Sequence, residues 1–201
     1  MQPRRVPQPI LSAALNGSVI EPELLNSARI EAKYGNYGID VIDAEGGVRR
    51  SNLYSTATQN GELHRTCRTF SVVCIEDLPS GVVDGEHDAV MRGGSIGAIF
   101  KAHGWGIFKE TLHTGALELP AGARTIPRLM RLEHVSELAM HIYRLLLSKA
   151  ASALTYATIV EVHHPDYLGL EELTRSYAAD APLEMRDSEK QTFAAHVLRE
   201  V

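Results

Sequence analysis

A glycine-rich turn is the first place in the chain where residue types and their spacing suggest chemistry. The turn and its neighbours combine backbone amides with two cationic side chains: Arg92, Gly93, Gly94, Ser95, Gly97 and Lys101. Glycine amides that precede the first turn of a helix can converge on an anion, and the helix end adds partial positive charge. We therefore expect the segment to bind a small anionic ligand. The competing interpretation is a tight connection between two helices, because glycine turns commonly separate elements.

Two histidines lie close enough to this turn in the sequence to act on a ligand bound there. His103 falls at the end of the helix predicted after the turn, and His113 falls in the strand predicted next. An imidazole changes its charge near neutral pH, so either side chain could serve as a general acid or base. The chain has no nucleophile elbow and no complete catalytic set. We therefore favour a ligand-binding or regulatory module without a cofactor. The alternatives are an enzyme that uses His103 or His113, and a structural or assembly protein without a ligand.

A possible set of metal ligands occurs at His134, Glu137 and His141. On a helix, offsets of three and seven residues place all three side chains on one face, within reach of a single ion. The same face would continue to Arg144, whose charge would repel a bound metal. We interpret the set as the solvated face of a helix and predict no metal site.

Glu161 and His163 form a further pair, because they lie two residues apart in a predicted strand and so share one face. A carboxylate and an imidazole on one face could act as an acid/base pair at the end of a sheet. A polar strand terminus is the simpler interpretation. We therefore leave both residues out of the predicted site.

The elements that would position these residues are predicted from periodicity and from capping residues. Ser95 is a favourable N-cap, and Gly104 can end the same helix in a left-handed conformation. Alternation predicts strands over residues 28–34, 39–43, 48–54, 65–76, 105–119 and 153–163. Helices are predicted over residues 84–91, 96–103, 135–151, 168–178 and 188–198. The imperfect alternation within 105–119 indicates a β-bulge or a strand that leaves the core.

This order of elements predicts an α+β fold, in which a mostly antiparallel sheet of about five to six strands has its helices packed on one face. The chain has 201 residues, of which 44% are hydrophobic and 22% are charged, and this composition is typical of a globular protein. We predict one α+β domain over residues 21–201. A mobile segment over residues 1–20, with a proline-rich start, would precede it.

Charge and cysteine content limit the classes of partner. The formal net charge is -5, which disfavours a general nucleic-acid or anionic-membrane binder. No apolar run approaches the roughly 20 residues of a membrane helix. Cys67 and Cys74 fall in one predicted strand, where their odd separation puts them on opposite faces. We therefore expect a reduced cytoplasmic protein, and a homodimer, because two-fold assemblies are common among soluble proteins.

Overall fold

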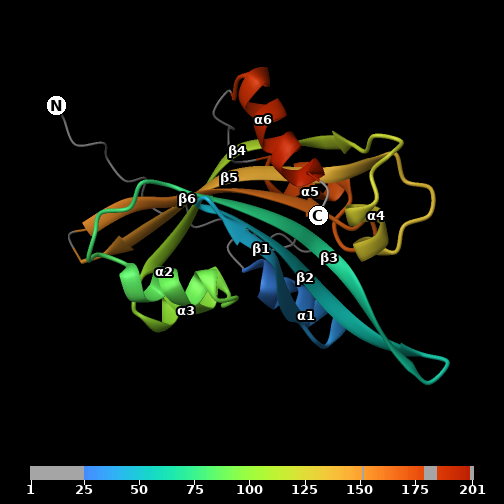
Figure 1. Ribbon diagram of the computed structural model, residues 1–201, viewed down its shortest axis with the longest axis horizontal. Helices are drawn as coiled ribbons and strands as arrows, with labels where there is room; N and C mark the ends of the chain where they lie inside the picture. The colour runs from blue at the N-terminus through green and yellow to red at the C-terminus, as the bar shows by residue number, and fades with distance from the viewer. Residues whose placement is uncertain (1–24, 151, 179–184, 200–201) are drawn as a thin grey trace.

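A single six-stranded antiparallel sheet organises the protein (Figure 1). The computed structural model describes residues 25–150, 152–178 and 185–199. The strands are β1 (Gly38–Glu45), β2 (Val48–Gln59), β3 (Glu62–Ile75), β4 (Gly106–Glu118), β5 (Glu137–Lys149) and β6 (Ser152–His163). The helices are α1 (Asn26–Tyr34), α2 (Asp84–Met91), α3 (Ile96–Ala102), α4 (Thr125–Met130), α5 (Leu170–Ser176) and α6 (Asp187–Leu198). These elements confirm the α+β class and the antiparallel sheet predicted from the sequence.

The strand order is β1-β2-β3-β6-β5-β4, so two three-stranded meanders join at the centre through β3 and β6. The β2–β3 hairpin is longer than predicted and projects from the body of the molecule (Figure 1). Pairing places Ser51 opposite Ser71, Ser71 opposite Glu161 and Glu161 opposite His141. A row of polar residues therefore crosses four neighbouring strands on one face of the sheet.

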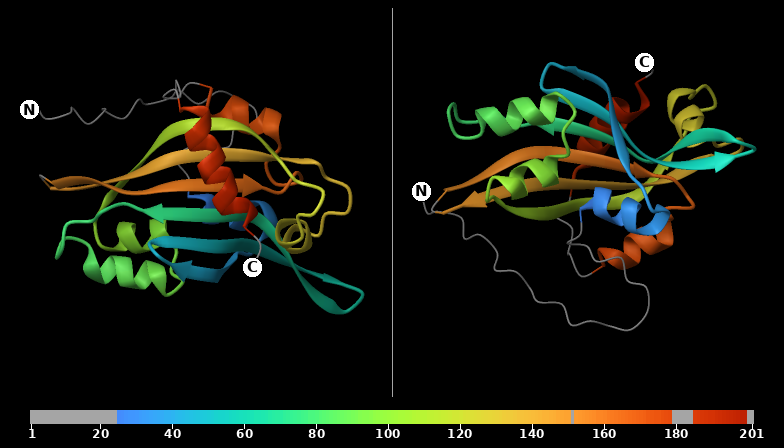
Figure 2. Two further views of the ribbon diagram at one scale, coloured as in Figure 1. Left: turned by 45° about the horizontal axis from the view of Figure 1, so that its top comes forward. Right: turned by 90° about the horizontal axis from the view of Figure 1, so that it is seen from below.

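Helices cover both faces of the sheet, whereas the sequence suggested one (Figure 2). Helices α1, α2, α3 and α5 pack on the face that carries the polar row. Helix α6 crosses the opposite face, where it shares a hydrophobic cluster with α4. The physical reason lies in the central strands, because Val72 and Val73 of β3 are both buried although they point to opposite faces. Each face therefore needs its own cover.

Residues 28–34, predicted as a strand, belong to helix α1. The alternation of apolar and charged residues is real, but alanine, arginine, glutamate and lysine are all good helix formers. The buried residues of this helix are Asn26, Arg29 and Ile30, whose offsets of three and four residues define one helical face. The prediction was wrong because two periodicities fit this short stretch, and packing selected the helical one.

The helix predicted over residues 135–151 is also wrong, because most of this segment forms strand β5. Apolar residues at helical spacing run from Leu138 to Leu147, but the positions between them are largely apolar as well. Ala139 and Tyr143 are as buried as Met140 and Ile142, which point to the other face. A strand covered on both sides reads as a continuous apolar run, and periodicity alone does not separate it from a buried helix.

Four register shifts interrupt the strand pairing within the described sheet, and two of them bear on the predictions from the sequence. The irregularity expected within 105–119 is confirmed as a register shift between Thr111 and His113 of β4. A second shift leaves Arg68 of β3 as an extra residue, because Leu53 pairs with Thr69 and Tyr54 pairs with Cys67. Cys67 and Cys74 consequently contact the same hydrophobic cluster, contrary to the prediction of opposite faces, and both are free thiols.

Two further expectations concern a membrane-spanning helix and the first 20 residues. No helix within the described residues is long and apolar enough to cross a membrane. The predicted mobile segment, residues 1–20, lies outside the described residues.

Candidate functional site

A cavity of about 70 Å³ lies between the sheet and helices α1 and α3. This volume accommodates several water molecules or a small organic group. Every strand of the sheet contributes one apolar residue to the wall: Ile39, Leu53, Val73, Ile107, Leu145 and Ile159. The cavity therefore sits over the middle of the sheet. Figure 2 shows α1 and α3 on that face of the sheet.

Three charged side chains line the cavity: Arg49 from β2, Lys109 from β4 and Glu161 from β6. None of them forms an ion pair with another described residue. Two cations and one anion leave a formal charge of +1 at the cavity. Arg49 and Glu161 are buried and Lys109 is partly buried. Burying charges without ion-pair partners costs stability, so the presence of these groups around one cavity is not explained by the stability of the fold.

Arg49 is the most deeply buried of the three, with 1% of the residue exposed. Its Nη1 donates to the carbonyl oxygens of Val90 at 2.7 Å and Gly94 at 3.0 Å, and its Nε donates to Ser51 Oγ at 2.9 Å. Nη2 forms no hydrogen bond to a described residue. Burial lowers the pKa of Arg49, but a guanidinium stays protonated near neutral pH. Within the described residues, two carbonyl oxygens and the Ser51 hydroxyl, all uncharged, accept the hydrogen bonds of this positive charge.

Glu161 is 4% exposed and is only half satisfied. Its Oε1 accepts a hydrogen bond from Asn26 Nδ2 at 3.2 Å, whereas Oε2 has no partner among the described residues. Burial by itself raises the pKa of Glu161, but the positive charges of Lys109 and Arg29 outweigh burial and hold that pKa below its ordinary value. The side chain is therefore an ionised carboxylate at neutral pH.

Tyr143 connects the second cation to the carboxylate side of the cavity. Lys109 Nζ lies 4.6 Å from the centre of the Tyr143 ring, a cation–π contact that leaves the three ammonium hydrogens available. Burial, followed by the nearby charge of Glu161, raises the pKa of Tyr143 well above its usual value. The phenol is consequently neutral over the working pH range.

Asn26 attaches the start of α1 to the sheet beneath the cavity. Its Nδ2 donates to Thr69 Oγ1 at 2.9 Å as well as to Glu161, and its Oδ1 accepts from the Tyr167 hydroxyl. Thr69 Oγ1 also lies 3.0 Å from Nδ1 of His163. All five side chains are buried. This network fixes both the helix and the orientation of the Glu161 carboxylate.

Two buried histidines lie behind this network. Burial is the main cause that lowers the pKa of His163 to about 4 and the pKa of His141 well below its ordinary value. Both imidazoles are thus neutral at pH 7. His163 Nε2 and His141 Nδ1 have no hydrogen-bond partner among the described residues.

The first two glycine amides of the turn are used within the protein, whereas anion binding at the amides of Ser95 to Gly97 stays a prediction. The amides of Gly93 and Gly94 donate to the carbonyls of Val90 and Ala89, each at 3.0 Å, and so close the end of α2. Gly93 has φ of 108°, which favours glycine. Their amides therefore already have acceptors within the protein. The turn instead presents its carbonyl oxygens, and the carbonyls of Val90 and Gly94 hold Arg49.

Ser95 and Gly97 are the predicted binding residues that line the cavity. Ser95 is the N-cap of α3 in an extended conformation, as the sequence predicted, although its side chain makes no capping hydrogen bond. Gly97 is buried against Leu25, and a Cβ added there would lie 2.2 Å from Leu25 Cδ2. The glycine thus permits the close approach of α1 and α3 that forms one wall.

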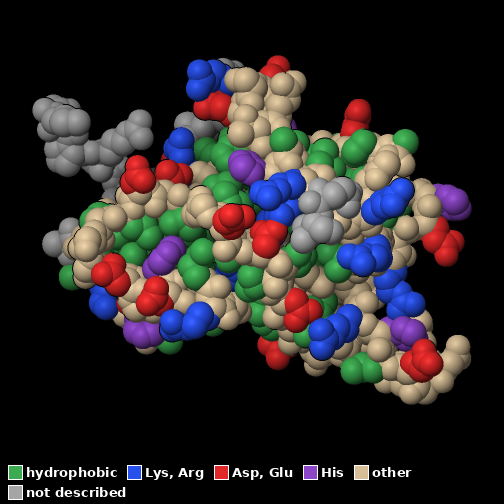
Figure 3. All heavy atoms as spheres, viewed as in Figure 1, with side chains coloured by type: hydrophobic (Ala, Val, Ile, Leu, Met, Phe, Trp, Pro, Cys, Tyr) green, Lys and Arg blue, Asp and Glu red, His purple; other side chains and the backbone are tan. Residues whose placement is uncertain are grey.

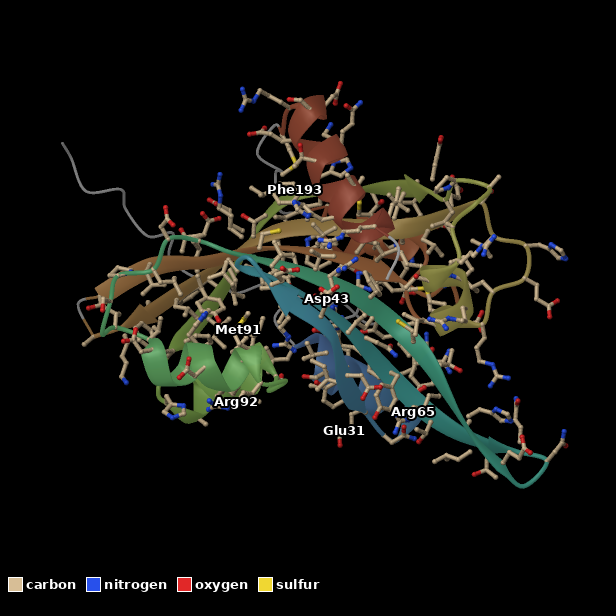
Figure 4. All side chains as sticks on the ribbon, viewed as in Figure 1. Glu31, Asp43, Arg65, Met91, Arg92 and Phe193 are labelled. Atoms are coloured by element: carbon tan, nitrogen blue, oxygen red, sulfur yellow. The ribbon has the colours of Figure 1, made fainter. Side chains whose placement is uncertain are left out.

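The other predicted side chains do not line the cavity. Arg92, Lys101 and His103 are exposed, and Arg92 lies on the outer side of the α2–α3 unit (Figure 4). His103 Nδ1 lies 2.8 Å from the carbonyl of Ile99 in its own helix. Strand β4 carries His113 on the face covered by α6, where burial and the charge of Lys190 lower its pKa. Neither histidine of the enzyme hypothesis is therefore near the cavity.

His134, Glu137 and His141 do not share a helical face, because β5 begins at Glu137 and His134 precedes it. The solvated-face interpretation is wrong for His141, which is fully buried opposite Glu161. Within the described residues, no three His, Cys, Asp or Glu side chains are grouped so as to hold a metal ion.

A second hollow, of about 440 Å³, lies between α6 and the opposite face of the sheet. Its polar groups are largely paired within the protein, because Arg144 bonds Glu110 at 3.0 Å and Thr158 donates to Glu76 at 3.0 Å. The surface in Figure 3 mixes both signs of charge with hydrophobic side chains. We find no concentration of unpaired groups there comparable to that of the first cavity.

Sequence reasoning missed Arg49 and Lys109, and it weighed Glu161 as an acid/base partner of His163 but favoured a polar strand terminus. The one available signal was an arginine at a position that shares parity with the inward-facing Ser51 and Leu53 of the predicted strand. No known protein family matches the chain, and no curated protein is significantly similar to it.

Proposed function

We propose that the protein binds a small organic acid in the cavity between the sheet, α1 and α3. The observation that carries this function is the burial of Arg49 beside the cavity without a carboxylate partner among residues 25–150, 152–178 and 185–199. A ligand carboxylate would accept from the unbonded Nη2 and neutralise the guanidinium. Hydrogen bonds between charged groups contribute about 1.5–3 kcal/mol, so this contact would account for a large share of the affinity.

The walls of the cavity define the rest of the ligand. One apolar side chain from each strand faces it, which favours a hydrocarbon body rather than a heavily hydroxylated one. The formal charge of +1 matches a monoanion. The ligand must be small, since the cavity holds about 70 Å³.

Lys109 supplies a second cation to the same ligand. Its ammonium group has no ion-pair partner in the part of the chain that the structure describes, and it lies over the Tyr143 ring. Ser95 and Gly97 supply the wall formed by α3. The anionic ligand expected from the glycine turn is thus retained, but its principal contact moves from the amides of the turn to Arg49.

Binding is tested with a panel of linear, branched and aromatic monocarboxylates. Thermal shift and ligand-observed NMR titration detect and measure the binding. We expect at least one acid to bind the wild-type protein. Arg49→Gln should lower the affinity for that acid by about 10- to 100-fold. Lys109→Met removes no hydrogen bond between described residues, and it should lower the affinity for the acid by a smaller factor than Arg49→Gln does.

Arg65→Gln is the matched control, because Arg65 is an exposed arginine of the same sheet, paired with Asp40 at 3.1 Å (Figure 4). Its affinity for the acid should equal that of the wild type. The binding function is refuted if no acid in the panel binds, or if Arg49→Gln and Lys109→Met both bind as tightly as the wild type.

A further inference from the structure

On the basis of the binding function above, we infer that the ligand is an organic acid that also carries a hydrogen-bond donor, such as a hydroxyl or amino group, and that Glu161 recognises this donor. The proposal assigns Glu161 as the residue that selects between acids of similar shape. It therefore adds a substrate class to the site and a specificity-determining residue.

The position of Glu161 in the sheet supports this assignment. Strand β6 lies between β3 and β5, so Glu161 projects from the centre of the sheet. Arg49 lies two strands away on one side and Lys109 lies two strands away on the other. A spacing of about 4.8 Å per strand separates each of these strands from β6 by roughly 10 Å. When the carboxylate of a ligand is held by either cation, a part of the ligand other than this carboxylate therefore faces Glu161.

The unsatisfied oxygen of Glu161 supplies the chemical preference. An ionised carboxylate accepts hydrogen bonds and donates none. Asn26 satisfies Oε1, and Oε2 is buried without a partner among the described residues. A ligand hydroxyl or amine would provide the missing donor, whereas a methyl group at the same place would leave the charge unpaired. Sites built to bond a ligand donor strongly reject the analogue that lacks it.

A neighbouring group within the protein offers the alternative explanation. Besides burial, both the charge of Glu161 and a hydrogen-bonding interaction of the phenol with this carboxylate raise the pKa of Tyr143, although the distances and angles leave Oε2 itself without a bonded partner among the described residues. If this phenol turned to satisfy Oε2, the carboxylate would need nothing from the ligand. That alternative and our inference differ in one measurable property, which is whether the wild-type protein prefers acids with a donor.

The test compares pairs of acids in which a methyl group replaces a hydroxyl: 3-hydroxybutyrate with 3-methylbutyrate, 4-hydroxybutyrate with pentanoate, and 4-hydroxybenzoate with 4-methylbenzoate. Dissociation constants are measured by NMR titration of the wild-type protein and of Glu161→Gln. In at least one pair we expect the wild type to bind the hydroxy acid about 10-fold or more tightly than the methyl acid. In Glu161→Gln that preference should fall to within about 3-fold, because the neutral amide tolerates the methyl acid.

Glu110→Gln is the control, since it removes the same charge from a half-exposed residue paired with Arg144. It should keep the wild-type preference. Equal binding of both members of every pair by the wild type overturns the inference without any variant, and so does a preference that survives in Glu161→Gln. Failure of the binding function itself looks different, because then neither member of any pair binds, or binding is indifferent to Arg49→Gln and Lys109→Met.

Discussion

Asn26→Ala is expected to lower the free energy of unfolding by about 3–5 kcal/mol. The substitution removes the hydrogen bond that Glu161 Oε1 accepts, one hydrogen bond to Thr69 and the acceptor of the Tyr167 hydroxyl. Each buried polar group left unsatisfied costs about 1–3 kcal/mol. This amide joins the start of α1 to the sheet, whereas Ile30 packs against the sheet further along the helix, so the start of the helix should also lose its fixed position over the cavity.

Urea unfolding followed by far-UV circular dichroism measures this effect. Tyr167→Phe gives a graded comparison, since it removes one bond of the network and should cost only about 1–2 kcal/mol. Glu31→Ala is the control on the same helix, where Glu31 is exposed on the outer side (Figure 4), and it should change stability by less than about 0.5 kcal/mol. A loss in Asn26→Ala no larger than that of the control would mean that the network does not hold α1.

Acidification from pH 7 to pH 4 is expected to lower the free energy of unfolding by about 3 kcal/mol through His163 alone. The pKa of His163 is about 4 in the folded protein and 6.5 as the ordinary value. Between these two values the unfolded chain binds more protons than the folded one, so stability rises with pH across this window. Above about pH 6.5 both states are deprotonated, and the contribution becomes constant.

His141 acts in the same direction, because its pKa is also depressed by burial. Unfolding in urea at several pH values gives the slope of stability against pH. His163→Gln should flatten that slope between pH 4 and 6.5, while His134→Gln, at an exposed histidine, should leave it unchanged. An unaltered slope in His163→Gln would show that the folded protein already tolerates the charged imidazole at position 163.

Both effects arise from the unusual polarity of the core on the cavity side. Of the buried side-chain atoms without partners among the described residues, those of Tyr37 and Glu161 belong to cavity-lining residues. Those of Arg29, His141 and His163 lie in the polar cluster behind them, and of these atoms only that of Asn52 belongs to the opposite face, where Asn52 pairs with Phe70. Native cores contain few such atoms, and proteins retain locally unfavourable groups mainly at functional sites. Their concentration on one side supports the location of the proposed site.

The sequence by itself determined the elements whose signals are local. Ser95 identified the start of α3, the Gly46–Gly47 pair marked the first hairpin, and alternation over 153–163 predicted β6. Each of these signals lies within a few residues of the element it specifies. The two large errors, α1 and β5, occurred where helical and extended periodicities both fitted the residues, so only packing against the sheet could select one.

The tertiary structure alone decided the site. Arg49, Lys109 and Glu161 come from three strands that are not neighbours, and they meet only because β3 pairs with β6 and joins the two meanders. Strand pairing between distant segments depends on the summed burial of whole faces and leaves no local pattern in the chain. The glycine turn was visible from the sequence, but whether it offers amides to a ligand or carbonyls to Arg49 depends on which strand passes beneath it.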